Sequence, residues 1–267
     1  MIRMKAIELI HYLEEMIPPT CACSWDNVGL LAGRRDKEVK RVYVALDATD
    51  EVVADAIRNN CDFLLTHHPL LFHSVKRITD EDFIGRRLLG IIGSDISYYA
   101  MHTSFDAAPD GMADMAAMLL GLGMGVPMEV MSDELETPWG IGKTGNLEEE
   151  CTLRELCERV KERFMVKNVN VYPAKGLEGK VKRVAISPGS GRSMIEAAKN
   201  TQAEVLITGD IGHHEGIDAQ AMGISIIDAG HFGLEKIFIP IMAERIRGDF
   251  PELEIFTAQP QAPCQVL

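Results

Sequence analysis

The segment VKRVYVALDATDEVVADAIRNNCDFLLTHH (39–68) decides the fold of this chain. An apolar run at each end and an amphipathic stretch between them predict a strand, a helix and a second strand. The segment aligns without a gap with VKRVAISPGSGRSMIEAAKNTQAEVLITGD (181–210), and both contain Val-Lys-Arg-Val, an Ala, a Leu and a Thr at matching positions. Unrelated units of this kind also share buried apolar residues. This overlap spans a whole unit, however, so we predict an internal duplication.

A second pair of matching segments, ISYYAMHTSFD (96–106) and ISIIDAGHFGLE (224–235), follows at a different offset. Short apolar runs predict strands at 41–46, 62–66, 96–101, 140–145, 168–172, 183–187, 204–208 and 224–228. Helical periodicity predicts helices over 5–16, 112–124, 152–164 and 232–247. Thr152 and Glu155 form a capping box at the start of one of them. This alternation predicts an α/β fold with two similar domains, each with a mainly parallel or mixed sheet covered by helices.

The break between the two domains is expected around MGVPMEVMSDELETP (124–138), which is rich in Gly, Pro and acidic residues and has no clear period. The predicted domains are therefore 1–125 and 126–267. The segment TAQPQAPCQVL (257–267) is rich in Pro and Gln, which predicts a poorly packed end.

The composition excludes several classes of protein. Among 267 residues, 46% are hydrophobic and no apolar run reaches the roughly 20 residues of a membrane span, so we expect no membrane partner. The 40 acidic and 27 basic residues give a net charge of -13, which disfavours nucleic acid as a partner. Six dispersed cysteines and a start unlike a signal peptide predict a reduced, cytoplasmic protein. The CxC pair Cys21 and Cys23 is a weaker metal candidate.

Histidines gather where predicted strands end. Ligands of open α/β sheets bind beyond the carboxyl ends of the strands. A single histidine is more often a surface or core residue than a ligand, but six at strand ends beside carboxylates indicate a site. Six of the eight histidines lie there: His67, His68, His102, His213, His214 and His231.

Five of these strand-end residues fit a site for two metals. His67 and His68 are adjacent, so in an extended segment their side chains leave in opposite directions and suit two metals better than one. His231 and Glu235 are four residues apart at a helix start, which places them on one face. Asp106 completes a set of five ligands that leaves positions for water or substrate. Mixed imidazole and carboxylate ligands suit zinc, manganese or iron, and the sequence does not choose among these divalent ions.

The remaining strand-end histidines are candidates for proton transfer. His102 and His214 are each expected to act as a general acid or base. The alternative is a supporting role, in which each orients a metal ligand through a hydrogen bond. His213 is a candidate for the same two roles.

Two loops have a functional and a structural interpretation. The segment SPGSGRS (187–193) follows a strand, so its backbone N–H groups and Arg192 either cradle a phosphate or form only a turn and a helix start. Trp25, Asp26 and Asn27 follow the first predicted helix. They either form a wall of a cleft or serve as turn and capping residues.

The chain also resembles a known family. SWDNVGLLAG (24–33), THHPLLF (66–72), HTSFDAAPDGMAD (102–114), TGDIGHHE (208–215) and DAGHFGLEK (228–236) are similar, in order and over essentially the whole chain, to the signature blocks of the NIF-three-like proteins, also called GTP cyclohydrolase I type 2 homologues. The resemblance implies two α/β domains facing each other across two metals, and a homohexameric ring. It implies the same metal ligands: His67, His68, Asp106, His231 and Glu235.

Two functions from different classes follow as hypotheses. The first is a dinuclear metal-dependent hydrolase, in which metal-activated water attacks a small molecule and His102 or His214 moves the proton. The resemblance implies a nucleotide, with ring opening of GTP, although such ligands also serve phosphoesterases and amidohydrolases. The second is a metal-binding regulatory or chaperone-like interaction protein without strong catalysis.

Overall fold

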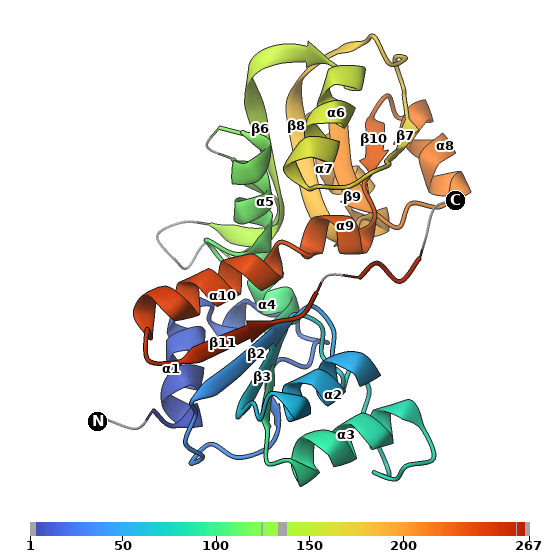
Figure 1. Ribbon diagram of the computed structural model, residues 1–267. Helices are drawn as coiled ribbons and strands as arrows, with labels where there is room; N and C mark the ends of the chain where they lie inside the picture. The colour runs from blue at the N-terminus through green and yellow to red at the C-terminus, as the bar shows by residue number, and fades with distance from the viewer. Residues whose placement is uncertain (1–3, 124, 133–137, 260, 265–267) are drawn as a thin grey trace. The chain divides into compact units, whose positions relative to one another are not determined.

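The computed structural model describes residues 4–123, 125–132, 138–259 and 261–264. The chain divides into two compact units (Figure 1). Unit 1 is Met1–Phe105 with Phe238–Gln261, and unit 2 is Asp106–Ile237 with Ala262–Leu267. The bounds of these units differ from 1–125 and 126–267 in two ways: residues 106–125 belong to unit 2, and a helix and a strand near the carboxyl end of the chain belong to unit 1. The division predicted from the repeat stays a prediction.

The sheet of unit 1 is mainly parallel. Within the described residues it has five strands, in the order β1 (Gly29–Ala32), β4 (Ser97–Ala100), β3 (Phe63–Thr66), β2 (Arg41–Ala45) and β11 (Glu254–Thr257). Among these five described strands, β1 at the edge is the one that runs antiparallel to its neighbour. Every residue of β3 and β4 is buried, as expected of central strands with both faces covered.

Helices cover both faces of this sheet. Because right-handed crossovers join β2, β3 and β4 in sequence, the two connecting helices share one face, and Figure 1 shows two further helices on the other. The connecting helices are α2 (Asp50–Arg58) and α3 (Phe83–Gly93), and the others are α1 (Ala6–Met16) and α10 (Phe238–Asp249). Tyr12 and Phe250 pack edge to face at 4.8 Å between centroids, which joins α1 to the end of α10.

Unit 2 contains a mixed sheet. Its six strands, counted over the described part of the chain, follow the order β5 (Val126–Ser132), β6 (Trp139–Thr152), β8 (Lys180–Ser190), β9 (Val205–Gly209), β10 (Ser225–Asp228) and β7 (Asn170–Tyr172). The central strands β8, β9 and β10 are parallel, and the remaining pairings are antiparallel.

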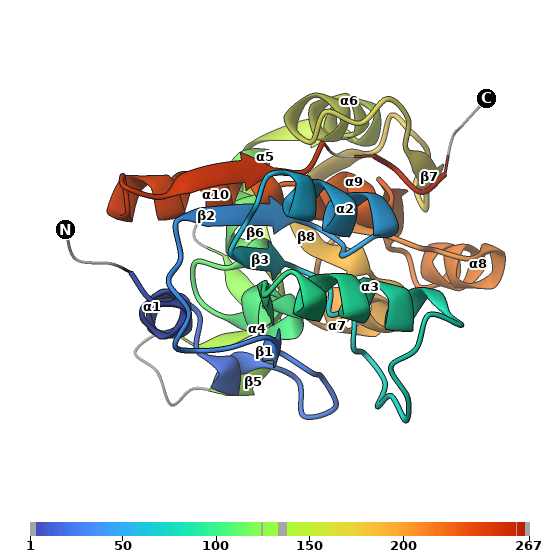
Figure 2. The same cartoon turned by 60° about the horizontal axis from the view of Figure 1, so that its bottom comes forward.

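The helices of unit 2 are short and lie on both sides of its sheet, with α6 and α7 on opposite sides (Figure 2). They are α5 (Met112–Leu120), α6 (Leu153–Arg163), α7 (Ile195–Asn200), α8 (His213–Ala221) and α9 (His231–Glu235). The predicted capping box is confirmed, because Thr152 and Glu155 each accept from the backbone N–H of the other. Across the described chain, no helix combines the length and the apolar character needed to cross a membrane.

The two units match in detail along the predicted repeat. Each has three successive parallel strands with an antiparallel edge strand beside the third. A carboxylate oxygen of Asp62 accepts from the backbone N–H groups of residues 40 and 41, at 2.9 and 3.1 Å. At the aligned positions, a carboxylate oxygen of Glu204 accepts from those of residues 182 and 183, at 2.8 and 3.1 Å. Such matches are expected if the two units arose by duplication.

Most predicted elements are confirmed, and the exceptions have local causes. Each predicted strand lies on an observed one, but β1, β5 and β11 were not expected. β5 occupies part of the expected break at 124–138, whose residues 124 and 133–137 lie outside the described chain. The predicted helix 232–247 is two helices, because Pro240 has no N–H and its ring excludes a continuous turn back to Lys236.

Candidate metal-binding residues

The predicted histidine pair follows the central strand of unit 1. β3 ends at Thr66, whose hydroxyl donates to the carbonyl oxygen of His68 at 2.7 Å. The N–H of His68 donates to the carbonyl oxygen of Leu46 at 3.0 Å. His67 is fully buried, and its ring centroid lies 4.7 Å from that of His68. The fold therefore fixes two neighbouring imidazoles at the carboxyl end of the strand.

Asp47 orients the second of these histidines. Asp47 follows β2, and its Oδ1 lies 2.9 Å from Nδ1 of His68. A carboxylate on one ring nitrogen fixes the tautomer of an imidazole and raises the basicity of the other nitrogen. Metal-ligating histidines commonly have such a partner. Nε2 is therefore the atom through which His68 would bind a metal.

His102 has a carboxylate partner of the same kind. It starts α4 (His102–Ala107) with a φ of +24°, which is unusual for a residue other than glycine. Its Nδ1 lies 2.8 Å from Oδ1 of Asp26, and Oδ2 of Asp26 accepts from the N–H and the hydroxyl of Thr103 at 3.0 and 2.5 Å. The Asp26 side chain is fully buried, and burial alone would raise its pKa. The hydrogen bonds from His102 and Thr103 outweigh burial and lower the pKa of Asp26 to about 2.

These contacts bring three of the predicted histidines together in unit 1. The ring centroid of His102 lies 5.5 Å from that of His67 and 5.5 Å from that of His68. Asp26 therefore has the capping role that was one of its two predicted interpretations. Its carboxylate also holds the ring of His102 beside the candidate metal ligands.

In unit 2, the predicted ligands His231 and Glu235 lie close together at the start of a helix. His231 begins α9 after Gly230, and Glu235 lies one turn later with 3% of its surface exposed. Nε2 of His231 lies 2.9 Å from Oε2 of Glu235, and its Nδ1 lies 2.8 Å from Oδ2 of Asp210. His231 thus repeats the arrangement of His68, with one ring nitrogen on an orienting carboxylate.

Gly189 provides the space that Glu235 occupies. A Cβ atom at Gly189 would lie 2.5 Å from Oε1 of Glu235, and its φ is +82°. β8 continues through this glycine to Ser190, so the first half of the segment 187–193 is strand and not an open phosphate loop. Arg192 pairs with Glu215 at 2.9 Å, and α7 has only six residues. The backbone of this segment thus takes part in strand pairing and in seating Glu235. Phosphate binding by its second half stays a prediction.

The structure gives less support to the remaining site predictions. Asp106 lies on α4, one turn after His102, and is partly buried. His213 and His214 are exposed at the start of α8, with ring centroids 5.2 Å apart. The role of Asp106 as a ligand and the role of His214 in proton transfer stay predictions.

Three carboxylates of this arrangement were missed by reading the sequence. Asp47 and Asp210 orient histidines, while Asp228 accepts from the N–H groups of Gly230 and Ile211 at 2.9 and 3.1 Å. Each of the three ends or follows a strand, as the histidines do. That position was the available signal, but spacing alone does not tell a ligand from a residue that orients one.

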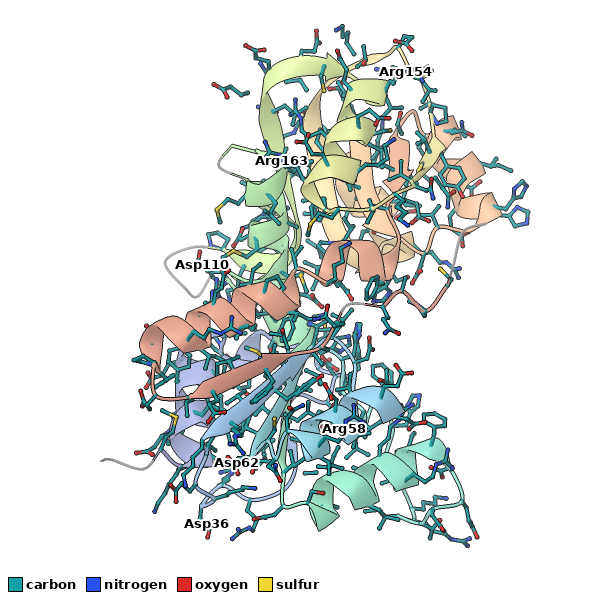
Figure 3. The ribbon with its side chains drawn as sticks, in the orientation of Figure 1. Asp36, Arg58, Asp62, Asp110, Arg154 and Arg163 are labelled. Carbon is teal, nitrogen blue, oxygen red and sulfur yellow. The ribbon has the colours of Figure 1, made fainter. Side chains whose placement is uncertain are left out.

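The opposite end of the first sheet holds a different polar cluster. A hollow of about 330 Å³ there is lined in part by Lys37, Cys61 and Asp62, and Figure 3 labels Asp62 at the amino end of β3. Nζ of Lys37 lies 3.4 Å from Asp62 and 3.7 Å from Asp95. Burial raises the pKa of the Cys61 thiol to about 12, so it is unreactive near neutral pH. These charges pair with each other and indicate a structural role.

The donor groups in each unit fit divalent transition metals. Imidazole and carboxylate together suit zinc, manganese and iron. Unit 1 offers His67 and His68, and unit 2 offers His231 and Glu235, which Gly189 admits against its backbone. Fold and side chains thus define a class: a mixed α/β protein with carboxylate-oriented histidines at the carboxyl ends of its central strands.

Comparisons with known proteins identify the family within that class. The family model described as Duf34/NIF3 (NGG1p interacting factor 3) matches residues 4–263, so the chain belongs to this family. A protein of Clostridium acetobutylicum named "GTP cyclohydrolase 1 type 2 homolog" is 33% identical over 254 residues, which cover 95% of this chain and 94% of that protein. "Protein NIF3 homolog" of Schizosaccharomyces pombe is 34% identical over 252 residues, covering 91% and 89%.

A solved structure supports the fold. The Bacillus cereus protein related to NIF3 superposes with a TM-score of 0.88 over 100% of both chains, at 24% identity. At that identity the likeness establishes the fold alone. The family predicted from the five sequence blocks is therefore confirmed.

Proposed function

We propose that this protein is a dinuclear metal-dependent hydrolase. Two divalent cations, zinc, manganese or iron, would be held by five side chains supplied by both units: His67, His68, Asp106, His231 and Glu235. The observation that carries the proposal is the pairing of Asp47 with His68 and of Asp210 with His231, at 2.9 and 2.8 Å. A hydrogen bond of this kind orients an imidazole for a metal.

The chemistry of the site would divide between the metals and the chain. Bound divalent cations would lower the pKa of a coordinated water to near 7 and so supply a nucleophile. Asp47 and Asp210 would hold the Nδ1 protons of His68 and His231, so that Nε2 of each faces its ligand position. Asp26 holds Nδ1 of His102, which leaves Nε2 of His102 to move a proton to or from the substrate.

The substrate we propose is a nucleotide. Relatives named "GTP cyclohydrolase 1 type 2 homolog" support this choice. For GTP, one water would add to the imidazole carbon of the guanine ring and open the ring to a formamide. A second water would hydrolyse this formamide and release formate. The net charge of -13 does not oppose a nucleotide, because divalent cations set the local potential at such a site.

The same proposal includes the assembly and the origin of the chain. A homohexameric ring and a cytoplasmic location remain part of it as predictions. The matched carboxylates Asp62 and Glu204, each capping the start of a strand pair, support an origin of the two units by duplication.

A regulatory or chaperone-like role is the second candidate. The observation that favours it is the description of the family as NGG1p interacting factor 3, which names a partner and not a reaction. In this role metals would stabilise the fold and turnover would be absent.

The first experiment measures metal. Elemental analysis of the purified protein should give about two divalent ions per chain, and the variant His67→Ala with His231→Ala should lose them. His11→Ala removes an exposed histidine of α1 and is the matched control. Full occupancy in the double variant would contradict the metal assignment.

The second experiment measures turnover. Metal-loaded protein is incubated with GTP, phosphoesters and cyclic amides beside the variant Asp106→Ala with Glu235→Ala. Glu149→Ala, at an exposed position of β6, is the control. Turnover that is lost only in the double variant supports the hydrolase, whereas equal rates in all three proteins favour the regulatory role.

A further inference from the structure

Two large aromatic rings lie exposed beside His102. Trp25 is 61% exposed and Phe72 is 46% exposed, and their ring centroids are 5.8 Å apart with the planes at 56°. Both rings also lie 6.1 Å from the ring centroid of His102. Exposed aromatic clusters are uncommon on soluble proteins and mark interaction sites.

The backbone under these rings is fixed. Next to Trp25, Asp26 is buried and bonded to His102 and Thr103. The side-chain amide of Asn27 donates to the carbonyl oxygen of Leu71 at 2.6 Å, which ties the loop of Trp25 to the loop of Phe72. The chain thus holds both rings in place without burying them. A ligand that stacks on them would meet a preorganised surface and lose little side-chain entropy.

The position of the rings points to a small ligand of the site. Other exposed apolar side chains of unit 1, such as Phe83, Leu89 and Ile92 of α3, lie on the helix surface. Trp25 and Phe72 instead lie beside His102. The ring centroid of His102 is 5.5 Å from that of His67 and 5.5 Å from that of His68, the two candidate metal ligands. A molecule on these rings would place its neighbouring atoms at the residues proposed to move a proton.

We propose that Trp25 and Phe72 form a stacking site for a planar heteroaromatic ring of purine size, which holds a nucleotide substrate by its base. Aromatic side chains bind bases through their faces with little dependence on sequence or substituents. This inference rests on the proposed function and names the part of the substrate that unit 1 recognises. It assigns Trp25 and Phe72 to substrate binding and not to the chemical step.

Tryptophan fluorescence tests the stacking directly. The chain has two tryptophans, so Trp139→Phe leaves Trp25 as the only reporter. GMP should quench the fluorescence of this full-length, metal-loaded variant in a saturable way. Ribose 5-phosphate, which has the sugar and phosphate but no base, should not. Equal effects of the two ligands, or none with GMP, would overturn the proposal.

Variants separate stacking from simple apolar contact. Trp25→Leu and Phe72→Leu keep apolar bulk and remove the ring, and each should raise the Kd for GMP about tenfold, measured by calorimetry. Trp25→Phe keeps a ring and should restore most of the affinity. Phe83→Leu removes an equally exposed ring of α3 and should leave the Kd unchanged. If Phe72→Leu and Phe83→Leu behave alike, the stacking site is wrong.

Different outcomes would show that the stacking site is wrong and that the proposed hydrolase function is wrong. If the protein retains no metal but GMP still quenches Trp25, the stacking site stands and the dinuclear hydrolase falls. If the metal-dependent turnover of a ring-free phosphoester such as glycerol phosphate is normal while Trp25→Leu leaves GMP binding unchanged, only the stacking site falls. If Trp25→Leu changes the sedimentation of the protein and not its affinity for GMP, the rings belong to a protein contact and the proposal is overturned.

Discussion

The two histidine-bearing helix starts, His102 in unit 1 and His231 in unit 2, are built alike but supported differently. Each begins a short helix after a parallel strand, and each has a carboxylate residue four positions later. The carboxylate that orients His231 is Asp210, which follows β9 within the repeat. His102 is oriented instead by Asp26, from a loop ahead of the repeat. The same local element has therefore acquired its support from different parts of the chain.

The aligned strand ends show the same divergence. Asp47 and His68 bind each other in unit 1, and their aligned positions in unit 2 are Gly189 and Asp210. Gly189 has no side chain and admits Glu235. Asp210 orients His231, and it occupies the position that aligns with His68 of unit 1. Equivalent positions thus carry a candidate ligand in one unit and the support of a candidate ligand in the other.

We expect the largest loss of stability from a side chain added at Gly189, which would enter the space that Glu235 occupies in unit 2. Gly189→Ala would place a Cβ atom 2.5 Å from Oε1 of Glu235 at a φ of +82°. We expect a loss of stability of about 2–4 kcal/mol, from backbone strain and overpacking together, measured by urea denaturation. Gly176→Ala is the control, because Gly176 has a φ of +75° and no atom within 4 Å of the added Cβ. Equal losses in both variants would show that Glu235 does not depend on Gly189.

The orienting carboxylates should control separate metals. Asp47→Asn and Asp210→Asn each remove the charge behind one histidine and should weaken metal binding about 10- to 100-fold. Competition with a chromogenic chelator should show one weakened ion of two in each variant, and weakening of both ions in the double variant. Asp218→Asn changes an exposed aspartate of α8 and should leave both affinities intact. Loss of both ions in a single variant would contradict the division of labour between the units.

Sequence periodicity predicted the central strands well because those strands are buried on both faces. β3 and β9 are continuous apolar runs, and each ends at a threonine or glycine followed by polar residues. Edge strands were harder to predict, since half-exposed strands such as β5 carry mixed residues and, at Pro127, one without an N–H. The apolar pattern in the sequence is strongest for strands at the centre of a sheet.

The candidate ligands could be predicted and their supports could not. His67, His68, His231 and Glu235 share the position and the chemistry of metal ligands, and both are visible in the sequence. The partner of His102 lies 76 positions away, at Asp26, and only tertiary structure brings the two together. Likewise no local pattern shows that Gly189 faces a carboxylate. Site prediction from sequence therefore stops where a role depends on long-range contacts.

The Asp26–His102 pair should make the stability of unit 1 depend on acid. The pKa of Asp26 in the folded chain is about 2, below its ordinary value of 3.8, so its contribution is fully present above about pH 4 and is lost as the pH falls through 2. The shift corresponds to about 2 kcal/mol. Urea denaturation of the metal-free protein between pH 5 and pH 2 should show this loss, and Asp26→Asn should remove it. A parallel pH dependence in the variant would assign the loss to other carboxylates.

The smallest expected difference between the units lies at two helix starts. Thr49 caps α2 in unit 1 by accepting from the N–H of Val52 at 3.2 Å, and Val52 has no group to return the bond. Thr152 caps α6 in unit 2, and Glu155 returns the bond to the Thr152 N–H at 2.7 Å. Loss of a capping threonine costs about 1 kcal/mol. Thr152→Ala should cost more than Thr49→Ala, because Glu155 also binds the hydroxyl that is removed, at 2.9 Å.

Urea denaturation of the two variants measures the difference, and Thr152→Ser, which keeps the hydroxyl, should retain most of the stability. An equal cost at both caps would mean that the returned bond in unit 2 contributes nothing beyond the single cap of unit 1.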